Sequence, residues 1–243
     1  MRTFAFASRC RRELLRDPLT VAFGLGFPLV LLYLLSLLQR NIPIPMFEVD
    51  TLAPGVAAFG LTFIALFSAM LVSKDRTRSL MMRLCASPMQ AQDFILGYLL
   101  PMLPLALGQS LVCFLFAIPL GLTVSGNILF AILGIIPMAV FNISLGLLFG
   151  SLLGVKQVGG VCGALLTNLS AWLSGVWFDL ELVGGVFEAV AHALPFYHAV
   201  ELEQALFRGD FDTALPHLLV AALYSILAAG MAVWCFLGQM KKQ

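Results

Sequence analysis

Long stretches without any charged side chain dominate the chain. Four of them contain between 21 and 28 residues, and the fifth, residues 94–155, contains 62. A helix that crosses a membrane needs about 20 apolar residues. The 62-residue stretch is long enough for two helices and has a cluster of breaker residues at 123–127. The pattern therefore predicts six spans, at roughly 19–38, 53–73, 94–121, 128–153, 157–177 and 214–237.

Helices are expected in these stretches, because apolar and polar residues do not alternate along them and lipid offers no partner to open backbone. Composition agrees: 60% of residues are hydrophobic, 11% are charged, and the mean hydropathy is +0.98. A soluble domain carries about 25% charged residues. The net charge of +1 leaves no excess for binding nucleic acid. We expect one all-α polytopic membrane domain over residues 1–243.

Basic residues predict the orientation. Twelve of the fourteen Lys and Arg residues fall before the first span, between the second and third, before the fifth, or after the last. Only Arg40 and Arg208 fall on the other side. Since short cytoplasmic loops are enriched in Lys and Arg, both termini are predicted to be cytoplasmic.

Three further segments have patterns of their own. Residues 2–17 combine basic and apolar faces, which favours an interfacial helix over a merely solvated leader. Residues 74–93 place Leu80, Met81 and Leu84 on one helical face among basic residues, which suits docking on a soluble partner or resting on lipid headgroups equally well. Residues 178–213 are acidic with apolar stretches, and short helices that dip into the outer leaflet compete with an ordinary amphipathic loop.

Chemistry within the spans is sparse. No Asp, Glu, Lys or Arg lies inside any of the six, which argues against a proton relay and an intramembrane hydrolase. No P-loop motif is present, so this chain cannot cradle a nucleotide in that way. The five cysteines have no metal-ligand spacing and read as small apolar residues. We therefore expect no catalytic residue, no metal and no cofactor in this chain.

Small residues recur at helical spacing in the fourth and fifth spans. Such faces let helices approach closely, within one chain or at a seam between two chains or along a pathway. The glycines concerned are Gly146, Gly150, Gly154, Gly159 and Gly163. A stripe of phenylalanines in the second span, Phe59, Phe63 and Phe67, fits lipid-facing or core packing, or the lining of an apolar pathway.

The order of these features resembles the membrane subunit of type-2 ABC exporters (ABC-2 type permeases). The motifs follow one another along nearly the whole chain. They are Arg16-Asp17-Pro18, Leu52-Ala53-Pro54-Gly55, Arg83-Leu84-Cys85-Ala86-Ser87-Pro88, Gly97, Leu173-Ser174-Gly175-Val176-Trp177-Phe178 and Leu194-Pro195-Phe196-Tyr197. Family members often carry an acid and a glycine shortly before the Arg-Leu-x-x-Ser-Pro stretch. Here Thr77 and Ser79 stand near those places, and Asp75 is the nearest acid.

The resemblance implies functional roles for these segments. Residues 74–92 would form a coupling helix seated on a separate ABC ATPase, present in two copies, which would bind ATP and magnesium. Residues 2–17 would form the connecting helix. The residues implied in coupling are Asp75, Arg76, Arg78, Leu80, Met81, Arg83 and Leu84.

The resemblance also implies a pathway between two permease halves, flanked by the second and fifth spans. Its lining would include Phe59, Phe63 and Phe67 with Asn168 and Trp172. The implied partners are a second permease half, as a homodimer, and membrane lipid, in a bacterial cell membrane. The apolar spans favour a lipophilic or amphipathic substrate: a drug, a lipid or an antimicrobial peptide. The alternative is an ATP-independent facilitator or channel.

Overall fold

The computed structural model describes residues 2–42, 47–77 and 91–240. Over these ranges the chain is helical and contains no strand, which confirms the all-α prediction. The elements are α1 (Arg2–Leu15), α2 (Pro18–Gln39), α3 (Val49–Thr77), α5 (Ala91–Ala117), η1 (Ile118–Leu120), α6 (Asn127–Leu152), α7 (Val155–Val158), η2 (Gly159–Leu166), α8 (Thr167–Leu173), η3 (Leu180–Leu182), α9 (Gly185–Ala193), α10 (Pro195–Arg208) and α11 (Phe211–Met240).

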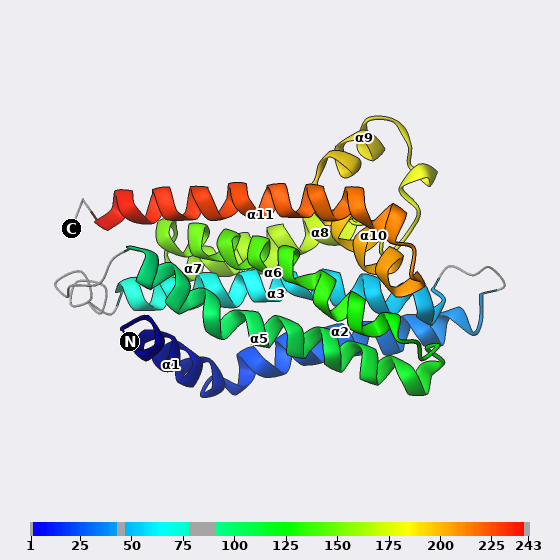
Figure 1. The fold of residues 1–243 in the computed structure, drawn as a ribbon, viewed down its shortest axis with the longest axis horizontal. Coiled ribbons are helices and arrows are strands. Elements are labelled where there is room, and N and C mark those ends of the chain that lie inside the picture. Colours follow the sequence, from blue (N-terminus) through cyan, green and yellow to red (C-terminus); the bar gives the residue numbers. More distant parts are fainter. Residues whose placement is uncertain (1, 43–46, 78–90, 241–243) are drawn as a thin grey trace.

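Five helices in the described part are long and apolar enough to cross a membrane: α2, α3, α5, α6 and α11. They lie side by side along the long axis of the molecule (Figure 1). Their bounds match five of the predicted spans to within a few residues, because charged or breaker residues flank each apolar stretch. The chain is thus a multi-pass helical bundle.

The remaining predicted span, 157–177, is built from three consecutive pieces. Residues 155–173 are helical without interruption, but the middle piece, η2, is a π-helix between α7 and α8. The hydroxyl of Thr167 donates to the carbonyl of Cys162, five residues earlier. The helix ends at Leu173, earlier than predicted, and Gly175 then adopts a left-handed conformation with φ of 76° that favours glycine.

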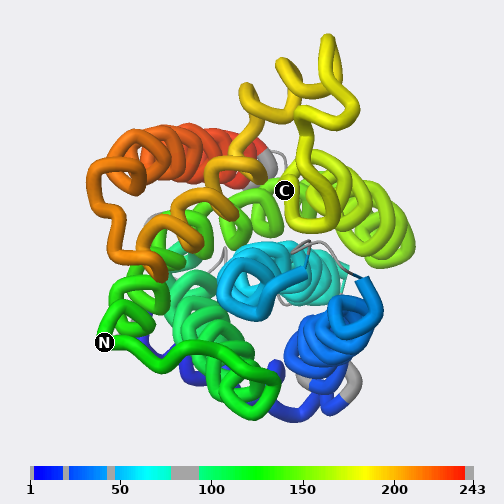
Figure 2. Tube along the Cα trace, turned by 90° about the vertical axis from the view of Figure 1, so that its right-hand side faces the viewer, coloured from blue at the N-terminus to red at the C-terminus, as the bar shows by residue number. Residues whose placement is uncertain are grey.

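Helix α3 occupies the centre of the bundle. Seen along the bundle axis, α2, α5 and α6 lie around it, and α11 lies beyond α6 (Figure 2). The apolar window of α3 is 89% buried, whereas those of the other long helices are between 22% and 44% buried. Gly146 and Gly150 on α6 face the α3 backbone around Ala65 and Ala69, where a Cβ atom would collide with main-chain oxygens. The two glycines therefore allow α6 to pack closely against α3.

Both termini lie at one end of the bundle, together with the end of α3 and the start of α5 (Figure 1). The turn between η1 and α6 and the α10–α11 junction lie at the opposite end. Segment 178–213 forms η3, α9 and α10, and η3 and α9 project together away from the bundle. Helix α10 instead packs against α3, α6 and α11 and buries Phe196, Val200, Leu202 and Phe207.

Candidate functional site

Asp75, in the last turn of α3, is fully buried and tied to two other helices. Both terminal nitrogens of Arg9 on α1 donate to its carboxylate, Nη1 to Oδ2 and Nη2 to Oδ1, each over 2.6 Å. The hydroxyl of Tyr98 on α5 donates to Oδ2 over 2.9 Å. A bidentate guanidinium–carboxylate pair fixes orientation as well as distance. The end of α3 is therefore held in one position against α1 and α5.

Packing of α1 on α5 brings Arg9 to this carboxylate. Phe6, one turn before Arg9, packs edge-on against Phe94 and Tyr98, with ring centroids 5.7 and 5.0 Å away. The Phe6 ring lies directly against Gly97 and occupies the space that a Cβ atom on residue 97 would need. Cys10 is completely buried on the same face. The apolar face of the leader thus packs on protein, and Arg9 projects at its edge toward Asp75.

The electrostatics of this cluster favour its charged form. The hydrogen bond to Asp75 raises the pKa of Arg9 against the opposing effect of burial. Glu13, one turn along α1, also accepts from Arg9 over 2.5 Å. Burial raises the pKa of the Cys10 thiol to about 12, so this cysteine stays protonated and unreactive.

The same turn of α3 also caps the end of α6. The Ser73 hydroxyl and Arg76 Nη2 donate to the carbonyl of Leu153, each over 3.0 Å, and Arg76 Nη1 donates to the carbonyl of Ser151. The last carbonyls of a helix lack partners within the helix, and a cation placed there is also stabilised by the negative end of the helix dipole. Lys74 adds an ion pair to Asp17 over 3.3 Å.

These contacts bear on the predicted coupling segment, 74–92, because residues 74–77 form the last turn of α3. Of the seven residues predicted to act in coupling, Asp75 and Arg76 belong to the anchored turn. Neither reaches out as an isolated surface group: both bind other helices of the same chain. The other five, Arg78, Leu80, Met81, Arg83 and Leu84, lie outside the described residues.

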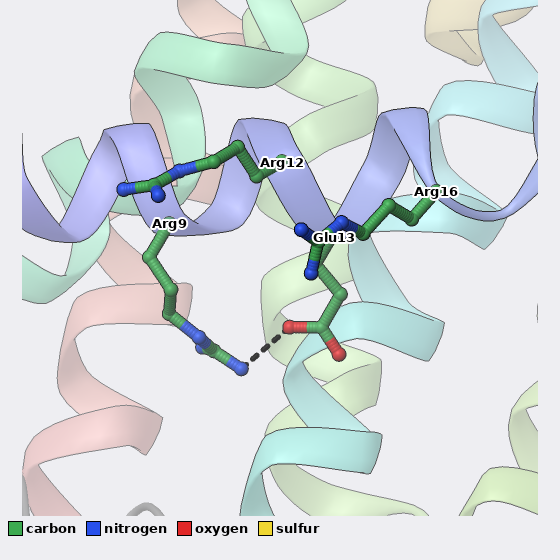
Figure 3. A pocket seen from close by; sticks show the side chains of 4 residues that line it. All are labelled: Arg9, Arg12, Glu13 and Arg16. Atoms are coloured by element: carbon green, nitrogen blue, oxygen red, sulfur yellow. Dashed lines mark hydrogen bonds and ion pairs between the residues drawn. The ribbon is translucent and has the colours of Figure 1, made fainter.

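A basic groove runs along the exposed side of α1 (Figure 3). Arg9, Arg12, Glu13 and Arg16 line an open volume of about 400 Å³. Arg12 and Arg16 are exposed, and Arg9 is turned toward Glu13. Beside these residues, Phe4 and Leu15 expose apolar side chains on the same helix. The leader therefore presents a mixed basic and apolar surface at the end of the bundle that carries both termini.

The predicted pathway residues lie in two different environments. Phe59, Phe63 and Phe67 are buried within the chain. Phe63 contacts Phe27 of α2 at 5.1 Å and Phe59 at 6.1 Å between ring centroids. Phe59 also contacts Trp177, at 5.4 Å. In this conformation α2 and the segment after α8 cover the stripe.

Asn168 and Trp172 instead lie on the outer surface of α8. Trp172 is 59% exposed, and within the described part of the chain the side chain of Asn168 bonds to the carbonyl of Ala164, one turn earlier in η2, over 2.8 Å. Apolar Leu165 and Leu169 are exposed on the same helix. A single chain therefore does not bring these residues together with the phenylalanine stripe.

The five glycines likewise divide into contacts and open positions. Gly146 and Gly150 pack on α3, and Gly163 faces Leu66 at an ordinary van der Waals distance. Gly159 has open space around it, and Gly154 meets only the Gln157 side chain. The small residues of α6 thus serve contacts within the chain, whereas Gly159 lies on an exposed part of η2.

Sequence reasoning missed Arg9, Tyr98 and Glu203. Arg9 counted only as one basic residue among twelve, although Glu13 four residues later was a signal of a local pair. Tyr98 is a polar tip in an apolar span, which predicts some partner but not Asp75. Glu203 read as part of an acidic loop, whereas α10 carries it into the bundle, where it is 1% exposed.

Together these features define a multi-pass α-helical membrane protein whose central helix is anchored at the end shared by both termini. A model of the ABC-2 type transporter family matches residues 1–207. The chain therefore belongs to that family, as its sequence motifs predicted, and is a transporter permease without catalytic activity of its own. The match ends before α11. No curated protein and no solved structure matches the chain significantly.

Proposed function

We propose that this chain is the membrane subunit of an ATP-driven exporter that moves a lipophilic or amphipathic substrate, such as a drug, a lipid or an antimicrobial peptide. Two copies of a separate ABC ATPase would bind ATP and magnesium, since an ABC-2 permease implies such a partner in general. A second copy of the chain would complete the permease. The subunit would lie in the cell membrane of a bacterium with both termini in the cytoplasm.

The observation that carries this proposal is the anchored turn at the end of α3. A soluble motor can move the bundle only through segments that are rigidly joined to it. The bidentate Arg9–Asp75 pair and the Arg76 cap join α1, α3, α5 and α6 where segment 78–90 leaves α3. A force applied to that segment would reach the central helix and three of its neighbours at once.

The two-copy arrangement draws support from the outer face of α8. A polar side chain at mid-span is stabilised by a partner on another helix. Within the described part of one chain, the side chain of Asn168 bonds to the carbonyl of Ala164, and exposed Trp172 lies one turn away. A second permease half on this face would cover both side chains and bring them into the seam between the halves.

The proposal is tested by co-purification and transport. The permease is tagged and co-expressed with the untagged ATPase of the same operon, and the complex is reconstituted into vesicles. We expect a stoichiometric complex whose uptake of an amphipathic dye into inside-out vesicles requires ATP and magnesium. Dye flux that is equal with and without ATP would instead identify a facilitator, and absence of a bound ATPase would contradict the proposal.

Orientation is tested separately. In a variant without native cysteines, Leu182→Cys marks the end opposite the termini and is 76% exposed. We expect a membrane-impermeant maleimide to label Leu182→Cys in intact cells and Ser79→Cys only after permeabilisation. The reverse pattern would contradict cytoplasmic termini.

A further inference from the structure

Glu203 is a carboxylic acid buried among helices that bring it no partner. It lies on α10 and is 1% exposed, and neither carboxyl oxygen has a hydrogen-bond partner within the described part of the chain. Its Oε1 lies against Gly134 of α6, where an added Cβ atom would come within 3.3 Å. Burying a carboxylate without a partner is costly, so such a group is kept neutral or meets a cation.

No ion pair of the described residues involves Glu203. Helix α6 contains no titratable residue, and the titratable residues at the near end of α3 and α11 are Asp50, Asp212 and His217. Asp50 accepts from Thr123, and His217 contacts His198. The other acidic, basic and histidine residues of α10 are His198, Glu201 and Arg208, and those of α9, which packs on α10, are Glu188 and His192. Burial alone raises the pKa of Glu203 well above its usual value, which favours the protonated, neutral carboxyl group.

A small, mainly apolar cavity that also has polar side chains in its wall lies one helical turn further into the bundle. It has a volume of about 10 Å³, and α3, α6, α8 and α10 line it. Its polar side chains are Thr62, Asn142, Ser170 and Ser174. Oδ1 of Asn142 is buried without a partner in the described residues.

Helical spacing connects this cavity to Glu203. Met138 and Ala199 line the cavity, and they lie four residues from Gly134 and Glu203 respectively. Residues four apart share a helix face. The contact between Gly134 and Glu203 therefore lies directly next to the cavity, along the same α6–α10 interface. We call Glu203 and the four polar side chains of the cavity the Glu203 seam.

The seam is closed in this conformation. Towards the end of the bundle that lies opposite the termini, Phe207 on α10 stacks on Phe114 of α5. The ring centroids are 6.0 Å apart and the ring planes differ by 12°. The cavity itself has room for about one water-sized centre. A larger guest can enter only when α10 separates from α6. Gly209 joins α10 to α11 and has a φ of 81°, a left-handed conformation that favours glycine. The backbone at this junction is thus suited to act as a hinge when α10 moves.

We propose that the Glu203 seam binds the positively charged head of a lipophilic cation when α10 moves away from α6. The reasons are the charge and the surroundings of the site. Glu203 is the one carboxyl group that the described residues bury without a partner, and the cavity beside it provides neutral oxygen acceptors for a cation. The apolar walls of Phe196, Val200 and Met138 would contact the hydrocarbon part of the ligand. This inference rests on the proposed function and narrows its substrate class to cationic amphiphiles.

The exchange is balanced in charge. In the closed state the site holds one proton on the Glu203 carboxyl group. When a monovalent cation binds, that proton leaves to water and the carboxylate pairs with the cation, so the buried seam stays neutral in both states. Binding must therefore release one proton per cation, and affinity must rise with pH.

Calorimetry on the purified permease, without any ATPase, tests this directly. Tetraphenylphosphonium is titrated at pH 7 in phosphate and in Tris, whose ionisation enthalpies differ, and the difference between the two heats counts the protons. We expect about one proton released per cation bound. The Glu203→Gln variant, which imitates the neutral acid, should bind at least 10-fold more weakly and release none. The matched control, Glu201→Gln on the same helix, should behave like wild type.

The outcomes separate this inference from the proposed function. Cation binding by the wild type without proton release, or by Glu203→Gln with unchanged affinity, would overturn the cation site, as would no binding by the wild type. The wild-type proton count decides even if Glu203→Gln fails to fold, and Glu203→Asp, which keeps the acid, should retain release. Failure of ATP-driven transport would instead contradict the proposed exporter function. It would not change the number of protons released on cation binding, which tests the cation site.

Discussion

Arg9 and Asp75 are 66 residues apart in sequence and form a two-point ion pair in which both terminal guanidinium nitrogens lie 2.6 Å from carboxylate oxygens. The carboxylate is fully buried, while a third of the Arg9 side chain remains exposed. The pair joins the leader helix to the last turn of the central helix. It thereby turns an interfacial leader into part of the rigid bundle.

The first prediction concerns this pair. Asp75→Ala should lower the free energy of unfolding by about 3 kcal/mol, because it removes the bidentate pair and leaves the partly buried Arg9 guanidinium with Glu13 alone. It should also separate ATP hydrolysis from transport in the reconstituted complex. Thermal unfolding in detergent and parallel ATPase and transport assays measure both effects. Lys74→Ala is the control, since its partly exposed pair with Asp17 should contribute less than about 1 kcal/mol.

The second prediction concerns segment 78–90 and rests on sequence alone. Leu84→Asp places a charge in the predicted apolar cluster of Leu80, Met81 and Leu84, each of which could contribute about 1.5–3 kcal/mol on burial. We expect loss of ATPase binding with normal membrane insertion, measured by co-purification. Ser79→Asp adds the same charge to the segment outside this cluster and should retain the ATPase. Normal transport by Leu84→Asp would show that this segment is not the coupling element.

The third prediction concerns helix packing. Gly150→Ala should lower the free energy of unfolding by about 1–3 kcal/mol, and with it the unfolding temperature. The reason is that the added Cβ would stand 2.5 Å from the carbonyl oxygen of Ala69 and force α6 away from α3. Gly230→Ala on α11 meets nothing within 4 Å and should not destabilise the protein. Equal effects of both changes would mean that helix propensity, and not the α3–α6 contact, determines the result.

The fourth prediction concerns pH. Nδ1 of His198 lies 2.8 Å from Nδ1 of His217, a contact that needs at least one neutral ring. Burial, and then the charge of His217, lower the pKa of His198 below 6.5. A lowered histidine pKa means that the unfolded chain binds the proton first, so stability falls as pH drops below about 6.5.

Thermal unfolding at pH 7.5 and pH 5.5 measures this loss, which should be smaller in His198→Gln. His192→Gln is the comparison variant: it keeps the main-chain oxygen to which His198 bonds and removes only the weaker effect of the His192 charge on the pKa of His198, so it should change the pH dependence less than His198→Gln. An identical pH dependence in the wild type and in His198→Gln would exclude His198 as its source.

The fifth prediction concerns the second permease half. In a variant without native cysteines, oxidation should link Asn168→Cys into dimers, because the outer face of α8 is predicted to meet its own copy. Ile226→Cys is 70% exposed on α11 and should remain monomeric, as expected for a lipid-facing position. Gel electrophoresis without reductant reads out both. Cross-linking of Ile226→Cys but not of Asn168→Cys would place the interface between the two permease halves on α11 instead.

Local pattern was enough to predict much of this chain. Lipid leaves no partner for exposed backbone, so a long apolar stretch between charged residues must become a helix, and its ends follow from those charges. The bounds of α2, α3, α5, α6 and α11 were therefore predicted to within a few residues. The order of short motifs was also enough to predict the family.

Tertiary structure decided which side chains meet. The stripe of Phe59, Phe63 and Phe67 has the same periodicity whether it faces lipid, a pathway or protein, and only the position of α3 at the centre buried it. Segment 178–213 read as an acidic outer loop, but the packing of α10 between α3, α6 and α11 carried Glu203 inside. Asp75 looked like one more acid beside a basic segment until α1 folded back onto α5 and brought Arg9 to it. Such contacts depend on helices far apart in sequence, so periodicity within any one helix cannot specify them.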